Sequence, residues 1–439
     1  MLPDRREGIR AARHLAAGAT PHEALDTGDP DAWIALDEGT RADHWYADPD
    51  WERSDGGRAL IAALRAGATL TDGQLALALC HRDGRVRHRA LGRAAGRPAL
   101  LPLVVLRCAD WAAPVRDRAR ERLTDALDEE MAVRLAPLVL RLGRRGRGDF
   151  AADRVGELLA GASAGVLAPL LTGADRGVRR YAYGIATGRG LLSPVELARA
   201  AAHDEDAVIQ SRSADAALAA VTEEDAEAVL AVLLGARGPR ARSAGVTALR
   251  RLGRPRRAVP FLADRSALVR ACARYVVRQH GTDPLPWYRD RCADPADPAL
   301  PPGAALGLGE CGQRADAALL WPLLEHPAPA VRAKAVAGLR ALDVTDVPRM
   351  RRLLDDPAPG VVREATLALA ASADALPADW LLERLDTGRP RWVRASAARL
   401  IGAHEAAVRM RAARVLLGDP DDRLRARAEQ AVQRLRGRG

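Results

Sequence analysis

The chain has 439 residues and a formal net charge of +10, with 48% hydrophobic but only 3% aromatic residues. This length and apolar content can bury a large core, yet no uncharged apolar run reaches the length of a membrane-spanning helix. The N-terminus lacks the apolar run of a signal peptide, and the five cysteines form no C-x-x-C pair. These features exclude a disulfide scaffold and predict a cytoplasmic protein with reduced thiols.

The first segment, residues 1–57, is acidic, unlike the rest of the chain. Residues 1–55 contain 13 Asp and Glu against 6 Arg, a net charge of −7, which leaves +17 for residues 56–439. Asp-Pro and Gly signals predict short helices joined by turns. We predict an N-terminal cap that closes the exposed end of the structure that follows, with an aromatic ligand or peptide pocket as the alternative. The aromatic residues of this segment are Trp33, Trp45, Tyr46 and Trp51.

Residues 58–439 carry a pattern that repeats every 31 residues near the C-terminus. A hydrophobe starts each copy, and a small residue follows four positions later, on the same face of a helix. Arg follows the hydrophobe in five of six copies, Pro301 being the exception. The six hydrophobes are Val269, Leu300, Val331, Val362, Val393 and Leu424.

Each copy also contains a second apolar segment upstream, such as residues 317–324, so the unit is predicted to be a pair of antiparallel helices. Asp-Pro pairs such as Asp356-Pro357 match an N-cap followed by a first helical residue. Weaker copies begin at Val86, Val115 and Val178, and the register between residues 120 and 178 stays open. The fold class is therefore all-α, a solenoid of roughly twelve stacked pairs.

The Asp-Pro-x-x-x-(Val/Leu)-Arg-x-x-Ala runs resemble the HEAT-repeat family, in its short bacterial form called HEAT-like or bilin-lyase-type. The resemblance implies a ladder in which an Asp and an Arg of each unit hydrogen-bond between neighbouring units. It implies little about activity, because such arrays serve as scaffolds, nucleic-acid binders and occasionally enzymes. Pairs with a matching six-residue spacing are Asp110/Arg116, Asp264/Arg270 and Asp419/Arg425, and the remaining ladder arginines are Arg332, Arg363 and Arg394.

In the same family, the second helix of each pair lines the concave face, so surface residues of that helix are candidates for partner contacts. The row three residues beyond each seam hydrophobe is basic in its N-terminal half, which predicts a track for an acidic protein partner. The alternative is a scatter of solvated arginines, since 66 of the 67 basic residues are Arg and genome base composition would produce the same bias. The candidate partner-binding residues are Arg89, Arg118, Arg180, Tyr181, Arg212 and Lys334.

Two common catalytic motifs are missing from the sequence: there is no G-x-x-x-x-G-K-[ST] loop and no H-E-x-x-H helix. We therefore predict a non-enzymatic protein-interaction scaffold that uses no cofactor or metal. The alternative is a nucleic-acid-binding solenoid related to the HEAT-like alkylpurine DNA glycosylases, which use aromatic side chains and an Asp. Trp111 beside Asp110, and Trp380 beside Asp379, resemble such a pair. Steep salt dependence of binding would favour this alternative.

Overall fold

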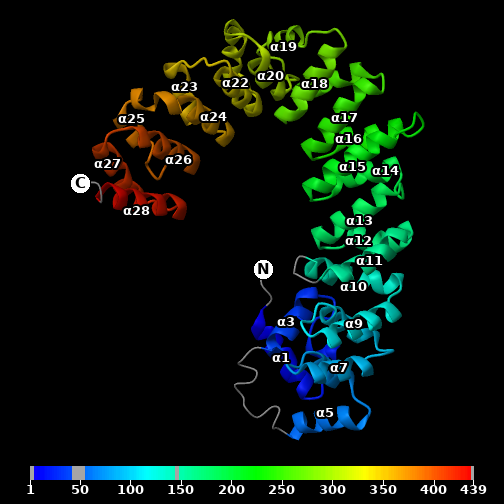
Figure 1. Ribbon diagram of the computed structural model, residues 1–439. Coiled ribbons are helices and arrows are strands. Elements are labelled where there is room, and N and C mark those ends of the chain that lie inside the picture. Colours follow the sequence, from blue (N-terminus) through cyan, green and yellow to red (C-terminus); the bar gives the residue numbers. More distant parts are fainter. Residues whose placement is uncertain (1–3, 42–54, 144–147, 437–439) are drawn as a thin grey trace. The chain divides into compact units, whose positions relative to one another are not determined.

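The computed structural model describes residues 4–41, 55–143 and 148–436, which form helices joined by turns with no strand among them (Figure 1). None of the helices in these ranges is long and apolar enough to cross a membrane. Trp45, Tyr46 and Trp51 lie outside the described residues. The chain divides into two compact units: unit 1 is Met1–Ala200 with Asp204–Ala217, and unit 2 is Ala201–His203 with Leu218–Gly439.

Unit 1 stacks antiparallel helix pairs in two layers. The first helices α6, α8, α10 and α12 contact one another in chain order, and the second helices α7, α9 and α11 do the same. α5 (Asp55–Ala66) runs across the predicted boundary at residue 57 and packs on α7. The pairs are α6 (Asp72–Leu79) with α7 (Gly84–Arg93), α8 (Leu101–Arg107) with α9 (Ala113–Ala126), α10 (Glu129–Leu142) with α11 (Asp149–Gly161), α12 (Ala164–Thr172) with α13 (Arg176–Gly188), and α14 (Pro194–His203) with α15 (Ala207–Ala220).

The register left open between residues 120 and 178 is now defined. Val115, Ala151 and Val178 each begin a buried stripe that repeats every four residues along α9, α11 and α13. The seam spacing is therefore 36 residues and then 27 residues, instead of 31 twice. The longer interval contains α10, which has 14 residues whereas α12 has 9, and this difference in helix length changes the seam spacing.

Unit 2 continues the same two-layer scheme with shorter first helices, several of them 3-10 turns. Twelve pairs occur in the described parts of both units together, as the repeat length predicts. Four further 3-10 turns occur in the described residues. One is in unit 1, η1 (Pro98–Leu100), and three are in unit 2, η3 (Arg314–Asp316), η6 (Ala370–Ala375) and η7 (Ile401–Ala403). The pairs of unit 2 are α16 (Ala226–Gly235) with α17 (Pro239–Arg251), η2 (Pro255–Ala263) with α18 (Ala267–Gln279), α19 (Leu285–Cys292) with α20 (Pro302–Cys311), α21 (Ala317–Leu320) and η4 (Pro322–Glu325) with α22 (Pro329–Ala341), α23 (Val347–Arg352) and η5 (Leu353–Asp355) with α24 (Pro359–Leu369), α25 (Ala378–Glu383) with α26 (Arg391–Leu400), and α27 (Ala406–Leu416) with α28 (Asp422–Arg436).

The seam residues are buried as their spacing predicts. In α22, Val331, Ala335 and Leu339 form one fully buried stripe, because residues four apart face the same neighbour. Small residues permit the closest crossings: a methyl group at Gly309 of α20 would lie 2.4 Å from the carbonyl oxygen of Gly338 in α22. Interior packing of this kind leaves no room for larger side chains.

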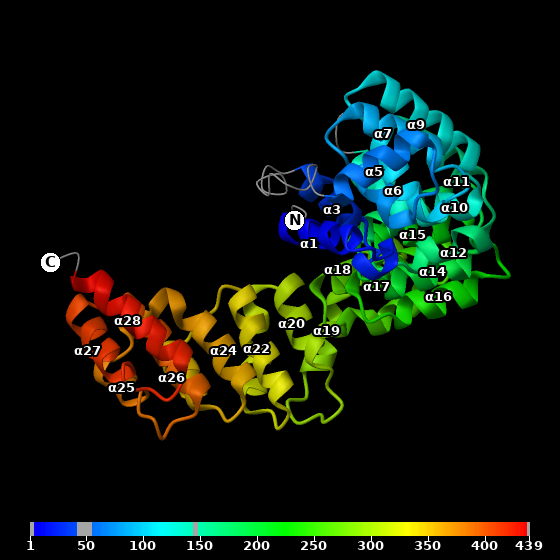
Figure 2. The ribbon, with the colours of Figure 1, turned by 90° about the horizontal axis from the view of Figure 1, so that it is seen from below.

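The N-terminal segment lies along the first-helix layer of unit 1. It contains α1 (Arg5–Ala16), α2 (Pro21–Ala24) and α3 (Pro30–Arg41). α1 and α2 contact α6, whereas α3 contacts α8 and α10, and Figure 2 shows α1 beside α6. The segment thus covers three successive pairs, and its role as a cap stays a prediction. Trp33 belongs to the core here and donates from Nε1 to the carbonyl oxygen of Thr27 at 3.1 Å.

Candidate partner-binding surface

Hydrogen-bonded ion pairs between an Arg of one helix pair and an Asp of the next connect the second-helix layer. In each, the Arg Nε and Nη2 reach the two carboxylate oxygens at 2.8–3.4 Å. The same carboxylate accepts the backbone N–H two residues further on, as Asp110 does from Ala112 at 3.0 Å. The five pairs of this Arg–Asp ladder are Arg87–Asp110, Arg179–Asp204, Arg242–Asp264, Arg332–Asp356 and Arg394–Asp419.

The six-residue Asp/Arg spacing has a different role from the one we expected. Arg270 donates to the backbone carbonyl of Asp264 at 2.6 Å, and Arg116 and Arg425 donate likewise to the carbonyls of Asp110 and Asp419. The Asp carboxylate in each case binds the Arg of the preceding pair. Asp110, Asp264 and Asp419 are thus each bound through the carboxylate by the preceding unit and through the carbonyl by an Arg of their own unit.

Two predicted ladder arginines find other partners. Arg270 pairs with Glu310, 40 residues further along the chain, and Arg274 joins it at 2.8 Å. Arg363 has a side chain that is 71% exposed and contacts only its neighbour Glu364 among the described residues. The Asp-Pro pairs also differ from prediction, since α24 begins at Pro359 and Asp356 lies outside it. The Asp therefore caps a turn and binds an Arg.

Acid is expected to weaken this ladder. The guanidinium of Arg394 lowers the pKa of the ladder residue Asp419, and outside the ladder Arg289 and Arg180 do the same for Asp316 and Asp206. Their folded-state pKa values lie below the unfolded value of about 3.9. Such carboxylates stabilise the fold fully above that value, and the stabilisation disappears as the pH falls through the folded-state pKa. We expect the urea concentration at the midpoint of unfolding to decrease once the pH is lowered below about 4. A midpoint concentration that stays constant down to about pH 2 would contradict this assignment.

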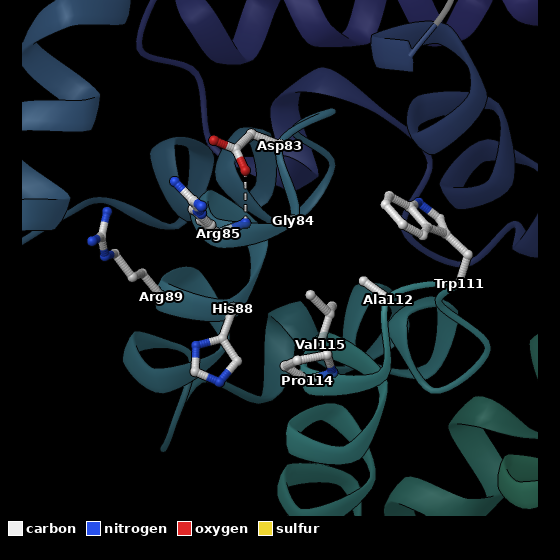
Figure 3. A pocket seen from close by; sticks show the side chains of 9 residues that line it. All are labelled: Asp83, Gly84, Arg85, His88, Arg89, Trp111, Ala112, Pro114 and Val115. Carbon is white, nitrogen blue, oxygen red and sulfur yellow. Dashed lines mark hydrogen bonds between the residues drawn. The ribbon is translucent and has the colours of Figure 1, made fainter.

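The first candidate groove lies between α7 and α9 and has a volume of about 440 Å³. Figure 3 shows Arg85 and Arg89 on one side of it and Trp111 on the other. Trp111 is 69% exposed, the highest value among the exposed large hydrophobic residues of the described chain. The ladder positions it, because Asp110 precedes it and the buried Arg87 guanidinium lies 5.9 Å from its ring centroid.

The second candidate groove lies between α13 and α15 and has a volume of about 360 Å³. Its α13 side carries Tyr183, Gly184 and Gly188, and its α15 side carries Val208 and Arg212. Burial raises the pKa of Tyr183 above its ordinary value. Both grooves separate consecutive second helices of unit 1.

The predicted basic track is only partly assembled. Arg89 lines the first groove and Arg212 the second, both exposed. Arg180 also lines the second groove, but its guanidinium binds both carboxylate oxygens of Asp206, at 2.8 and 2.7 Å. Exposed Asp153 and Glu157 on α11 lie between the two basic sites along the chain.

Three other predicted contact residues are half-buried and line neither groove. The Arg118 guanidinium covers Gly92 of α7, and the Tyr181 hydroxyl lies against Gly156 of α11. Lys334 belongs to α22 in unit 2. Sequence reasoning missed Trp111 and Gly184 as groove residues. The only available signal for Gly184 was its spacing of four residues from Gly188.

The aromatic–Asp pairs that resembled a glycosylase site are structural contacts. Asp110 is buried and bound by Arg87 and Arg107. Trp380 is contacted by Arg384, whose Cζ lies 3.3 Å from the ring centroid, while Asp379 is exposed beside Arg411. Across residues 4–41, 55–143 and 148–436, no group of three or more His, Cys, Asp or Glu could hold a metal ion.

Comparison with known proteins finds a family match for part of unit 2. Residues 317–402, which span α21 to η7 of unit 2, fit the family model for HEAT repeats. Residues 317–402 are therefore similar to HEAT repeats. The twelve pairs form an α-solenoid, and the Arg–Asp ladder joins its repeats. No curated protein matches the chain.

Several solved structures resemble the chain at low identity. An engineered protein is 16% identical, with 83% of this chain and 98% of that chain covered and a TM-score of 0.23. A chain from a structure of tubulin recruitment and assembly by microtubule polymerases with tumor overexpressed gene domain arrays is 12% identical, with 92% and 98% covered and a TM-score of 0.25. Kap121p is 13% identical, with 97% of this chain covered and a TM-score of 0.29. The chain spans 53% of Kap121p.

Proposed function

We propose that this chain is a non-enzymatic scaffold that binds an acidic segment of a partner protein on the second-helix layer of unit 1. The observation that carries the proposal is the groove between α13 and α15, with Gly184 and Gly188 on one side and the exposed Arg212 on the other. A partner backbone can approach glycine closely, and a partner carboxylate can pair with the guanidinium.

Gly184 supports this assignment because the fold does not require a glycine there. A Cβ atom at Gly184 would meet no heavy atom within 4 Å, and the residue lies inside α13 with an ordinary negative φ. Glycine inside a helix costs roughly 0.5–1 kcal/mol relative to alanine. No packing contact among the described residues offsets this cost. Close approach of a partner backbone to the open groove would offset it.

The charges favour a protein over a nucleic acid as the partner. Asp83 lines the first groove and Asp215 the second, and α11 exposes Asp153 and Glu157. A phosphate backbone would be repelled by these carboxylates, because its affinity comes mainly from unopposed positive charge. An acidic protein segment can place its carboxylates against Arg89 and Arg212 and its other side chains against these acids, whereas every phosphate of a nucleic acid is negative.

Selection of displayed random 12-residue peptides on the whole protein tests the proposal. We expect recovered peptides to be acidic and to lose at least tenfold in affinity for the Gly184→Leu variant, whose side chain fills the groove. Arg212→Glu should weaken binding similarly. Arg176→Glu is the matched control, because Arg176 is exposed on α13 but does not line the groove. Peptides that bind Gly184→Leu as tightly as wild type would refute the groove.

Duplex DNA provides the competing outcome. Submicromolar binding of a random-sequence duplex with a steep salt slope, lost in Arg212→Glu, would replace the protein partner with a nucleic acid.

Gly184→Ala is expected to stabilise the protein. Alanine restores helix propensity at an interior position of α13 and meets open space, so we expect a gain of about 0.5–1 kcal/mol in the free energy of unfolding. Urea denaturation followed by circular dichroism measures it. A loss of stability would show that the glycine serves the fold.

A further inference from the structure

The adjacent helices α17 (Pro239–Arg251) and α18 (Ala267–Gln279) of unit 2 contain seven arginines and no acidic residue. Three of the seven are neutralised inside the layer: Arg242 binds Asp264, and Arg270 and Arg274 bind Glu310. The remaining four arginines are exposed, and none forms an ion pair with another described residue. They are Arg240, Arg250, Arg251 and Arg278.

An apolar stripe accompanies these charges on α18. Leu268 is 49% exposed and Tyr275 is 46% exposed, with exposed Ala271 between them. The spacing of three and then four residues places all three on one helical face. Leu268 and Tyr275 are two of five exposed large hydrophobic residues in the described chain. Exposed apolar surface rimmed by polar groups is typical of an interaction site.

The basic and apolar parts form one surface, because Arg250 of α17 reaches Tyr275 of α18. Its Nη1 donates to the tyrosine hydroxyl at 3.0 Å, and its guanidinium lies 5.9 Å from the ring centroid. Arg278 lies one turn beyond Tyr275 on the same exposed face of α18. The α17–α18 face therefore presents apolar anchors beside unopposed positive charge.

The basic loop that follows α17 does not extend this face. Arg254 pairs with Glu223 and Glu227, and Arg257 pairs with Glu227. Arg251 is already bonded to the carbonyl oxygen of Leu218. Arg254 and Arg257 are thus neutralised, whereas the two helices carry four exposed arginines without an acidic partner among the described residues.

We propose that the α17–α18 face is the docking surface for an amphipathic, acidic helix of a partner protein. Leu268 and Tyr275 are seven residues apart, or about 10.5 Å along the helix at 1.5 Å per residue. This distance matches apolar side chains at positions i and i+7 of a docked helix, and acidic residues on its flanks would meet Arg250 and Arg278. The surface lies in unit 2 and is independent of the unit 1 grooves.

A designed peptide tests this proposal on the full chain. The probe is a fluorescent 18-residue helix with leucines at i, i+3, i+4 and i+7 and glutamates on its other face. A scrambled peptide of identical composition controls for charge alone. We expect anisotropy to show at least tenfold tighter binding of the amphipathic peptide, and at least tenfold weakening by the double substitution Leu268→Ser with Tyr275→Ser.

Matched variants separate this face from general exposure and charge. Val415→Ser with Leu417→Ser removes exposed apolar side chains elsewhere in unit 2, at residues that are 51% and 43% exposed, and should leave binding unchanged. Arg278→Glu should weaken binding severalfold, whereas Arg314→Glu, an exposed charge on η3, should not. Circular dichroism and melting temperature identify any variant that fails to fold.

Four results would overturn the proposal. Equal binding of the scrambled peptide would show that charge alone attracts it, and no binding of either peptide would remove the site. Binding of anionic phosphatidylglycerol vesicles that the Leu268→Ser, Tyr275→Ser variant loses, without peptide discrimination, would assign the face to a lipid surface. A dimer in light scattering that the same variant converts to a monomer would assign it to a second copy of the chain.

Discussion

The Arg394→Ala variant is expected to lose about 3–5 kcal/mol in the free energy of unfolding of the C-terminal repeats. Arg394 is buried and donates to both carboxylate oxygens of Asp419, at 2.8 and 2.9 Å, and Asp419 is buried as well. Truncation leaves that carboxylate without its countercharge and frees the backbone carbonyl of Arg389, which Arg394 also binds. A buried charge without a partner costs far more than the intact pair contributes.

The control for this prediction is Arg363→Ala, at the same repeat position one unit earlier. Arg363 is largely exposed and makes no ladder contact, so its loss should change stability by less than about 0.5 kcal/mol. Urea denaturation measures both variants, and hydrogen exchange of α26 and α28 locates the effect, because repeat arrays open locally. Similar losses in the two variants would mean that the Arg contributes through helix propensity and not through the ladder.

The Gly8→Ala variant is expected to release the N-terminal segment from the solenoid. A methyl group at Gly8 would lie 1.8 Å from the carbonyl oxygen of Ala35, where α1 crosses α3. The obstacle is backbone and cannot rotate away, so the two helices must separate. The buried residues Leu15 and Leu36 would lose their packing with them. We expect a loss of about 3 kcal/mol or more, the upper end of the range for overpacked cores.

Gly184→Ala again provides the control, because it adds the same methyl group to a helix interior with open space. Hydrogen exchange should show α1 and α3 losing protection in Gly8→Ala while the pairs from α12 onward keep theirs. Unchanged protection of α1 would show that the crossing adjusts without separating the helices.

Much of the repeat structure follows from residues close together in the chain. Val331, Ala335 and Leu339 are buried because residues four apart share a helical face, and any neighbour placed there covers all three. The interval between Val115 and Val178 was unreadable because α10 is longer than the other first helices of unit 1, which changes the spacing of the seams. The sequence located the row of arginines but could not show which of them are available to a partner, because a side chain such as Arg180 is paired with an acid from another segment.

The sequence by itself determined the class of fold, the number of helix pairs and the buried seams, because these depend on periodicity within single helices. The tertiary structure decided which charges remain available. Arg270 binds Glu310 rather than an aspartate of the next loop, Arg363 remains exposed, and α17 and α18 share a face without acids. These outcomes depend on which side chains meet across separate helices, and the spacing along the chain does not encode those distances.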